Sequence, residues 1–162
     1  MRVAGIIEND IVDGPDGVCV SVWLCGCPHK CKGCHNQIYW DFNSGEEIDE
    51  EEVAEMLKKA INKNGIIRDF SVLGGEPLCK ENIAAAEYLI SKVREAYPDI
   101  LITVWTGYTL EELKELKFSE LESILEKIDF LIDGRYVEEL RDTSLKLRGS
   151  SNQRILKKGE NF

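Results

Sequence analysis

The chain has 162 residues, of which 43% are hydrophobic and 31% charged, and its formal net charge at pH 7 is -10. This composition excludes a disordered or collagen-like chain, and the length suits a single domain over residues 1–162. A surface this negative repels phosphate backbones and anionic lipids, so we expect no direct nucleic-acid or membrane partner.

The N-terminal stretch gives no sign of a targeting segment. Glu8, Asp10 and Asp13 place acidic charges in it, whereas signal peptides need an apolar run and transit peptides avoid acidic residues. No part of the chain approaches the roughly 18 apolar residues of a membrane-spanning helix. We therefore expect a cytoplasmic protein. Because the cytoplasm keeps thiols reduced, the six cysteines predict metal or cluster ligation rather than disulfides.

The predicted elements alternate between strands and helices. In chain order they are a strand over 18–24, a helix over 50–62, a strand over 70–73, a helix over 81–96, a strand over 100–105, two short helices that begin after Thr109 and Ser119, and strands over 130–132 and 154–156. Alternating aliphatic residues mark the first strand. Thr109 followed by Glu112 is typical of a capping box at the start of a helix.

This alternation predicts an α/β fold with a largely parallel sheet and right-handed crossovers. About five strands are too few for a closed eight-stranded barrel, so we expect an open, partial β/α barrel of mostly parallel strands. Ligands of such sheets bind at the carboxyl ends of the strands. Four distinctive segments each follow one of the first four predicted strands: the cysteines, Gly-Gly-Glu-Pro, Trp-Thr-Gly-Tyr and Asp-Gly-Arg-Tyr. We therefore expect the four loops to converge at one end of the sheet.

The first cluster contains the spacing C-x3-C-x2-C at Cys27, Cys31 and Cys34. Thiolates this close can surround an iron-sulfur cluster, and three of them leave one of four irons open for a ligand. The competing interpretation is a closed structural zinc site with Cys25 as the fourth thiolate. His29, which lies between two of the cysteines, is expected to serve in packing or hydrogen bonding.

Five segments extend the pattern over nearly the whole chain. They are Gly-Cys-Pro-His-Lys-Cys-Lys-Gly-Cys-His-Asn at 26–36, Gly-Gly-Glu-Pro at 74–77, Val-Trp-Thr-Gly-Tyr at 104–108, Asp-Gly-Arg-Tyr at 133–136 and Arg-Gly-Ser-Ser-Asn-Gln-Arg at 148–154. In this order they resemble the activating proteins of anaerobic (class III) ribonucleoside-triphosphate reductases, a family within the radical S-adenosylmethionine (SAM) superfamily. The first and last segments are the most specific.

The resemblance implies a radical SAM fold with two cofactors, a 4Fe-4S cluster and SAM. It also implies an oxidoreductase in which the reduced cluster cleaves SAM to a 5'-deoxyadenosyl radical. That radical would remove hydrogen from a glycine in the large subunit of the reductase. An external electron donor such as flavodoxin or ferredoxin and a possible homodimer follow from the same resemblance.

The resemblance also suggests residues that bind SAM. Gly74 and Gly75 would let the backbone approach SAM closely, since a Cβ there would collide or forbid positive φ. Glu76 would accept a hydrogen bond from the SAM ammonium; the alternative is an exposed glutamate in a turn. Thr106 and Asn152 are candidates for contacts with the ribose or the carboxylate.

Further contacts are expected from the cysteine loop and from the fourth strand. Backbone atoms of Gly33, Cys34 and His35 would meet the adenine edge, and Arg135 would either pair with the SAM carboxylate or lie on the surface. Most of the superfamily has an aromatic residue where this chain has Gly33. In the related activases of pyruvate formate-lyase, an acidic residue that helps to form a cation site lies where this chain has Trp105. The resemblance therefore gives no support for a bound alkali cation here.

Two other functions are compatible with the sequence. The same chemistry could activate a different glycyl radical enzyme or modify a small molecule. A function of another class is a zinc-stabilised binding module.

Overall fold

A computed structural model describes all 162 residues of the chain. Seven strands form one sheet in the order β3-β1-β2-β4-β5-β6-β7. Their bounds are Arg2–Asp10 for β1, Cys19–Leu24 for β2, Glu46–Glu47 for β3, Asp69–Gly74 for β4, Ile102–Trp105 for β5, Phe130–Asp133 for β6 and Arg154–Lys157 for β7.

The sheet is mixed, and the predicted open barrel of about five mostly parallel strands, of radical SAM type, was wrong. Strands β2, β4, β5 and β6 are parallel neighbours, whereas β1 pairs antiparallel with β2 and with β3, and β7 pairs antiparallel with β6. The physical reason lies in the connections. No α-helix separates β1 from β2 or β6 from β7, so these neighbours run antiparallel rather than through a helical crossover.

Four helices connect the strands: α1 Glu50–Ile61, α2 Ile83–Ala96, α3 Leu110–Leu116 and α4 Leu121–Lys127. The predicted capping box of α3 is confirmed, since the Thr109 side chain accepts from the Glu112 backbone and Glu112 bonds back to Thr109. Asp49 caps α1 by accepting from the Glu51 N–H. Glu120, rather than Ser119, is the N-cap residue of α4 and makes no side-chain cap.

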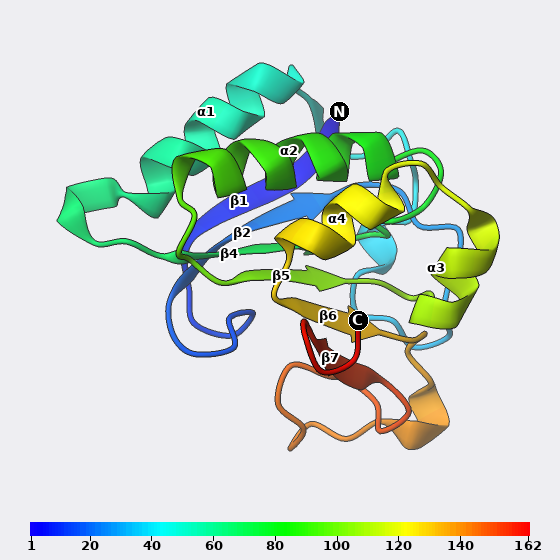
Figure 1. Ribbon diagram of the computed structural model, residues 1–162. Helices are drawn as coiled ribbons and strands as arrows, with labels where there is room; N and C mark the ends of the chain where they lie inside the picture. The colour runs from blue at the N-terminus through cyan, green and yellow to red at the C-terminus, as the bar shows by residue number, and fades with distance from the viewer.

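Helices α1, α2 and α4 lie over one face of the sheet, and α3 lies beyond the carboxyl end of β5 (Figure 1). The alternation along β2 shows how the two faces differ. Val20, Val22 and Leu24 belong to the hydrophobic core beneath the helices, whereas Ser21 and Trp23 belong to the opposite face. The opposite face of the sheet is therefore left free of these helices.

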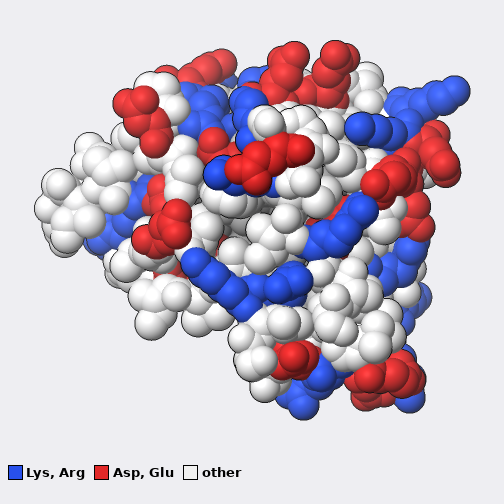
Figure 2. Space-filling model, turned by 60° about the horizontal axis from the view of Figure 1, so that its bottom comes forward, with Lys and Arg blue, Asp and Glu red and all other residues white.

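Charged side chains of both signs are interspersed on the face of the molecule seen in Figure 2, and no continuous basic surface covers it. None of the four helices has the length and apolar character needed to cross a membrane.

Candidate functional site

A cavity of about 740 Å³ lies on the face of the sheet opposite the helices. Trp23, Leu73 and Trp105 line it from the strands, and Cys27 and Gly134 line it from the loops that follow β2 and β6. The segments after four different parallel strands thus meet at one cavity, as the sequence predicted.

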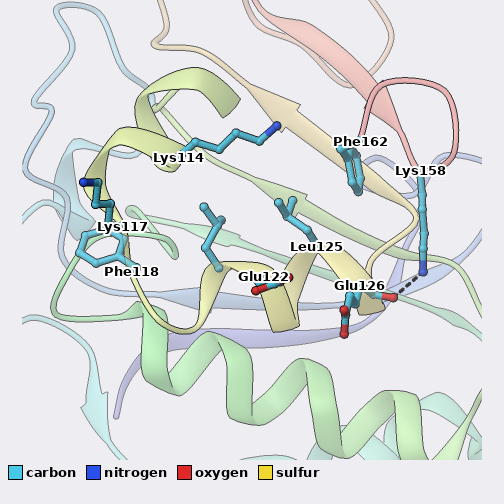
Figure 3. A pocket seen from close by; sticks show the side chains of 9 residues that line it. Lys114, Lys117, Phe118, Glu122, Leu125, Glu126, Lys158 and Phe162 are labelled. Carbon is cyan, nitrogen blue, oxygen red and sulfur yellow. Dashed lines mark hydrogen bonds between the residues drawn. The ribbon is translucent and has the colours of Figure 1, made fainter.

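A second cavity, of about 500 Å³, lies between α3, α4 and the C-terminal residues (Figure 3). Apolar side chains and lysines line it, including Phe118, Leu125, Phe162, Lys114, Lys117 and Lys158. The Lys158 ammonium donates to the backbone carbonyl of Glu126 at its edge. No cysteine or histidine lines this second cavity. The cysteine loop and the Gly-Gly-Glu segment line the larger cavity instead.

All three cysteines of the C-x3-C-x2-C spacing line the larger cavity. Cys25 does not: it is buried, and its sulfur lies next to Gly45. No three Cys, His, Asp or Glu side chains are grouped closely enough to hold a single metal ion. The cavity wall thus presents three thiols, Cys27, Cys31 and Cys34, without the fourth that the zinc interpretation required.

The Gly-Gly turn after β4 packs directly on the cysteine loop. The Gly75 N–H donates to the carbonyl of Leu24 at 2.7 Å, and the Glu76 N–H donates to the carbonyl of Gly26 at 2.8 Å. Gly74 has a φ of +113°, and a Cβ on it would lie 2.5 Å from the Leu24 carbonyl oxygen. These glycines therefore allow two backbone segments to approach each other, a role that a single sequence does not reveal.

Glu76 is completely buried, so its alternative interpretation as an exposed turn residue is wrong. Its Oε1 accepts from the Leu78 N–H at 2.9 Å and from the Thr106 hydroxyl at 2.8 Å. Its Oε2 accepts from the Gly107 N–H at 2.6 Å and lies 2.9 Å from His29 Nε2. A carboxylate offers about four lone-pair positions, and donors of this chain fill them all.

His29 is the residue of the cysteine loop that reaches Glu76, and it also contacts the loop after β6. Arg135 Nε donates to His29 Nδ1 at 3.2 Å, and Arg135 Nη1 pairs with Glu112 at 2.8 Å. The ring of Tyr108 lies edge-on to the imidazole, with 4.4 Å between the ring centroids. The sequence suggested a packing or hydrogen-bonding role for His29 but not these partners.

Most of the predicted cofactor-binding residues share the larger cavity, and two lie outside its lining. Those that line it are Gly33, Cys34, His35, Gly74, Gly75, Glu76 and Thr106. The other two are neighbours, because the Asn152 amide donates to the backbone carbonyl of Arg135 at 2.8 Å.

Sequence reasoning assigned no individual role to three further residues that line the cavity. Asp13 lines it from the loop before β2, and Arg148 and Gln153 line it from the segment before β7. Burial and the neighbouring Asp10 raise the pKa of Asp13 to about 7. The Asp10 and Asp13 pair was visible in the sequence only as an acidic stretch, with no sign that it borders a cavity.

Comparison with known proteins assigns a family. A family model described as a 4Fe-4S single cluster domain matches residues 12–156. An anaerobic ribonucleoside-triphosphate reductase-activating protein from Vibrio cholerae is 37% identical over 150 residues, which are 90% of this chain and 91% of that protein. The chain belongs to this family of reductase-activating proteins. Activating proteins of the same name from Escherichia coli (36% over 148 residues; 89% of this chain, 90% of that protein) and Enterobacteria phage T4 (36% over 155; 96% and 93%) agree.

In this member of the reductase-activating protein family, the residues that line the cavity fit a 4Fe-4S cluster. Three of these residues are cysteines, whose thiols suit a cluster with one open iron. Cys25 does not join them as the fourth thiolate of a closed zinc site, and both ring nitrogens of His29 are engaged by Glu76 and Arg135. Burial raises the pKa of Cys27, and burial followed by the charge of Cys34 raises that of Cys31. Because iron binds thiolates, loading the site must release these protons.

Proposed function

We propose that the chain is a glycyl radical activating enzyme, an oxidoreductase of the radical SAM kind. Its target is the large subunit of anaerobic ribonucleoside-triphosphate reductase. One observation carries the proposal: Cys27, Cys31 and Cys34 line a single large cavity and no fourth cysteine joins them. Three protein ligands leave one iron of a 4Fe-4S cluster open to bind a cofactor. Membership in the activating-protein family supports the choice of target.

Cys27, Cys31 and Cys34 would hold the cluster, which when bound would supply the electron for reductive cleavage of SAM and so for removal of a hydrogen atom from a glycine of the reductase. The protein's own part is to position SAM and to exclude water. Gly33, His35 and Thr106 line the cavity beside the cysteines, so we propose that they contact the adenosine part of SAM. Arg135 and Asn152 adjoin each other outside the lining. Arg135 is proposed to pair with the SAM carboxylate, and Asn152 to contact the ribose or the carboxylate.

We propose that Glu76 faces the SAM ammonium, although its carboxylate is already fully hydrogen-bonded within the chain. Its two oxygens already accept from Leu78, Thr106, Gly107 and His29. A direct hydrogen bond from the ammonium therefore requires one of these donors to withdraw, or two donors to share one carboxylate lone pair. Otherwise the carboxylate acts indirectly, by fixing the positions of the cavity-lining groups that donate to it.

The cluster needs an electron from outside the chain, because the C-x3-C-x2-C spacing provides ligands for the cluster but not the electron that reduces it. We propose a small one-electron carrier such as flavodoxin or ferredoxin in the cytoplasm. The reductase must deliver its glycine to the open cavity, so we propose that it docks on the face of the sheet opposite α1, α2 and α4 (Figure 1).

Anaerobic reconstitution with iron and sulfide tests the proposal. We expect four irons per chain, SAM-dependent release of 5'-deoxyadenosine after reduction, and a glycyl doublet in the electron paramagnetic resonance spectrum once the reductase is added. A colourless protein with one zinc and no iron would show the zinc-stabilised binding module instead. Deoxyadenosine release without a reductase signal would point to another glycyl radical enzyme or to a small-molecule substrate.

A further inference from the structure

We infer that His29 is a positioning residue, which holds the cysteine loop in its ligating shape by bridging Glu76 and Arg135 as the Nε2–H tautomer. The inference rests on the proposed cluster at Cys27, Cys31 and Cys34. It assigns a task to a residue that lies between two of these cysteines and is not itself a ligand.

The two contacts fix the proton on the imidazole. Arg135 Nε–H can only donate, so His29 Nδ1, at 3.2 Å, must present its lone pair. The proton of the neutral ring is then on Nε2, which lies 2.9 Å from the Glu76 carboxylate. A guanidinium on one side and a carboxylate on the other therefore select a single tautomer and a single ring orientation.

The surroundings leave the imidazole little freedom. Only 6% of the His29 side chain is exposed, and 1% of the Glu76 side chain. A Cβ on Gly107 would lie 2.4 Å from the imidazole Cδ2, and Tyr108 packs edge-on against the ring. The imidazole thus fits closely into the turn that follows β5.

The bridge joins four segments far apart in the sequence. His29 belongs to the cysteine loop, Glu76 follows β4, Tyr108 follows β5 and Arg135 follows β6. Outer residues of this type commonly hold ligands in place, and their loss typically lowers metal affinity roughly 10- to 100-fold. Because His29 lies two residues from both Cys27 and Cys31, a free imidazole would release the backbone between them.

Two substitutions separate hydrogen bonding from packing. His29→Phe keeps a planar ring against Tyr108 but removes both hydrogen bonds, whereas His29→Gln keeps an amide donor for Glu76. Lys32→Gln is the matched control, since this lysine of the same loop is 80% exposed and pairs only with Glu138 and Glu139. The measurement is the rate at which an iron chelator removes iron from each reconstituted protein, with unfolding of the cluster-free proteins recorded in parallel.

We expect His29→Phe to lose iron roughly 10-fold faster than the unsubstituted protein, and His29→Gln to remain within roughly threefold of it. Lys32→Gln should match the unsubstituted protein. Equal iron loss in His29→Phe and the unsubstituted protein would overturn the inference, as would equal, rapid loss in both His29 variants. If the unsubstituted protein takes up no four-iron cluster, the proposed function fails instead.

The tautomer provides a readout that needs no cluster. Long-range nitrogen–proton correlation spectra of the cluster-free protein should show the proton of His29 on Nε2. A proton on Nδ1 would contradict the bridge to Arg135, whatever the iron content of the loaded protein.

Discussion

Gly75 lies so close to Gly26 that a Cβ on Gly75 would stand 2.3 Å from the Gly26 carbonyl oxygen. The two glycines belong to the turn after β4 and to the start of the cysteine loop. Because backbone atoms cannot yield as a flexible side chain does, any side chain at position 75 must push the two segments apart. The shape of the candidate cluster site therefore depends on a residue that is not expected to touch iron.

Gly75→Ala should accordingly destabilise the protein by about 1–3 kcal/mol, the usual cost of overpacking. It should also accelerate iron loss after reconstitution, because the cysteine loop shifts. Gly5→Ala is the control, since a Cβ there meets nothing within 4 Å. Urea unfolding and chelator competition measure both effects, and a Gly75→Ala protein indistinguishable from Gly5→Ala would refute the close approach.

The cysteines give a sharper test of the ligand set. Cys27→Ala should abolish retention of the cluster, whereas Cys79→Ala should retain it, because Cys79 is buried away from the cavity lining. Cys25→Ala distinguishes a three-thiolate cluster from a four-thiolate zinc site. Retention of four irons in Cys25→Ala is the expected outcome, measured by iron and sulfide content under anaerobic conditions. Loss of all metal from Cys25→Ala would contradict the three-thiolate arrangement.

Glu76→Gln should be costly although the two side chains have nearly the same shape. A glutamine amide replaces one accepting oxygen with a donor, which would face either the Leu78 N–H and Thr106 hydroxyl or the Gly107 N–H and His29. Unsatisfied buried donors cost about 1–3 kcal/mol. Thermal and urea unfolding of the cluster-free protein measure this loss. The exposed Glu81→Gln is the control, and equal stability of the two variants would show that the Glu76 contacts contribute little.

Local signals predicted more of the fold than long-range ones. The strand at 18–24 and the capping box at Thr109 depend on residues adjacent in sequence, and the structure has both with small shifts of boundary. Strand β1 was missed because Gly5 and the polar run from Glu8 to Asp10 obscure its alternation. Without β1, the antiparallel side of the sheet could not be foreseen.

In the candidate site, too, local features were predictable from the sequence and long-range contacts were not. The spacing of Cys27, Cys31 and Cys34 is a local pattern, so the sequence alone predicted which thiols would face one cavity. Three of the four donors to Glu76 come from residues 30, 31 and 47 positions away. A pairing that depends on how three loops pack cannot be read from spacing, and the Gly75 contact with Gly26 has the same origin.

The carboxyl group of Asp13, which lines the cavity, predicts a pH dependence of stability. Burial and the nearby Asp10 raise its pKa to about 7, against an ordinary value of about 4 in the unfolded chain. Between these values the folded protein binds a proton that the unfolded chain does not. Stability should therefore fall as the pH rises from about 4 to about 7, and the loss is complete above that window.

Asp13→Asn imitates the protonated carboxyl and should remove this contribution. We expect the variant to be about 1–3 kcal/mol more stable than the unsubstituted protein at pH 8, and close to it at pH 4.5. Asp10 contributes in the opposite direction, because its pKa is lowered and its contribution to stability is lost as the pH falls. Urea unfolding at both pH values provides the measurement, with the exposed Asp16→Asn as the control from the same loop. A stability difference between Asp13→Asn and the unsubstituted protein that does not change from pH 4.5 to pH 8 would contradict a proton on the Asp13 carboxyl.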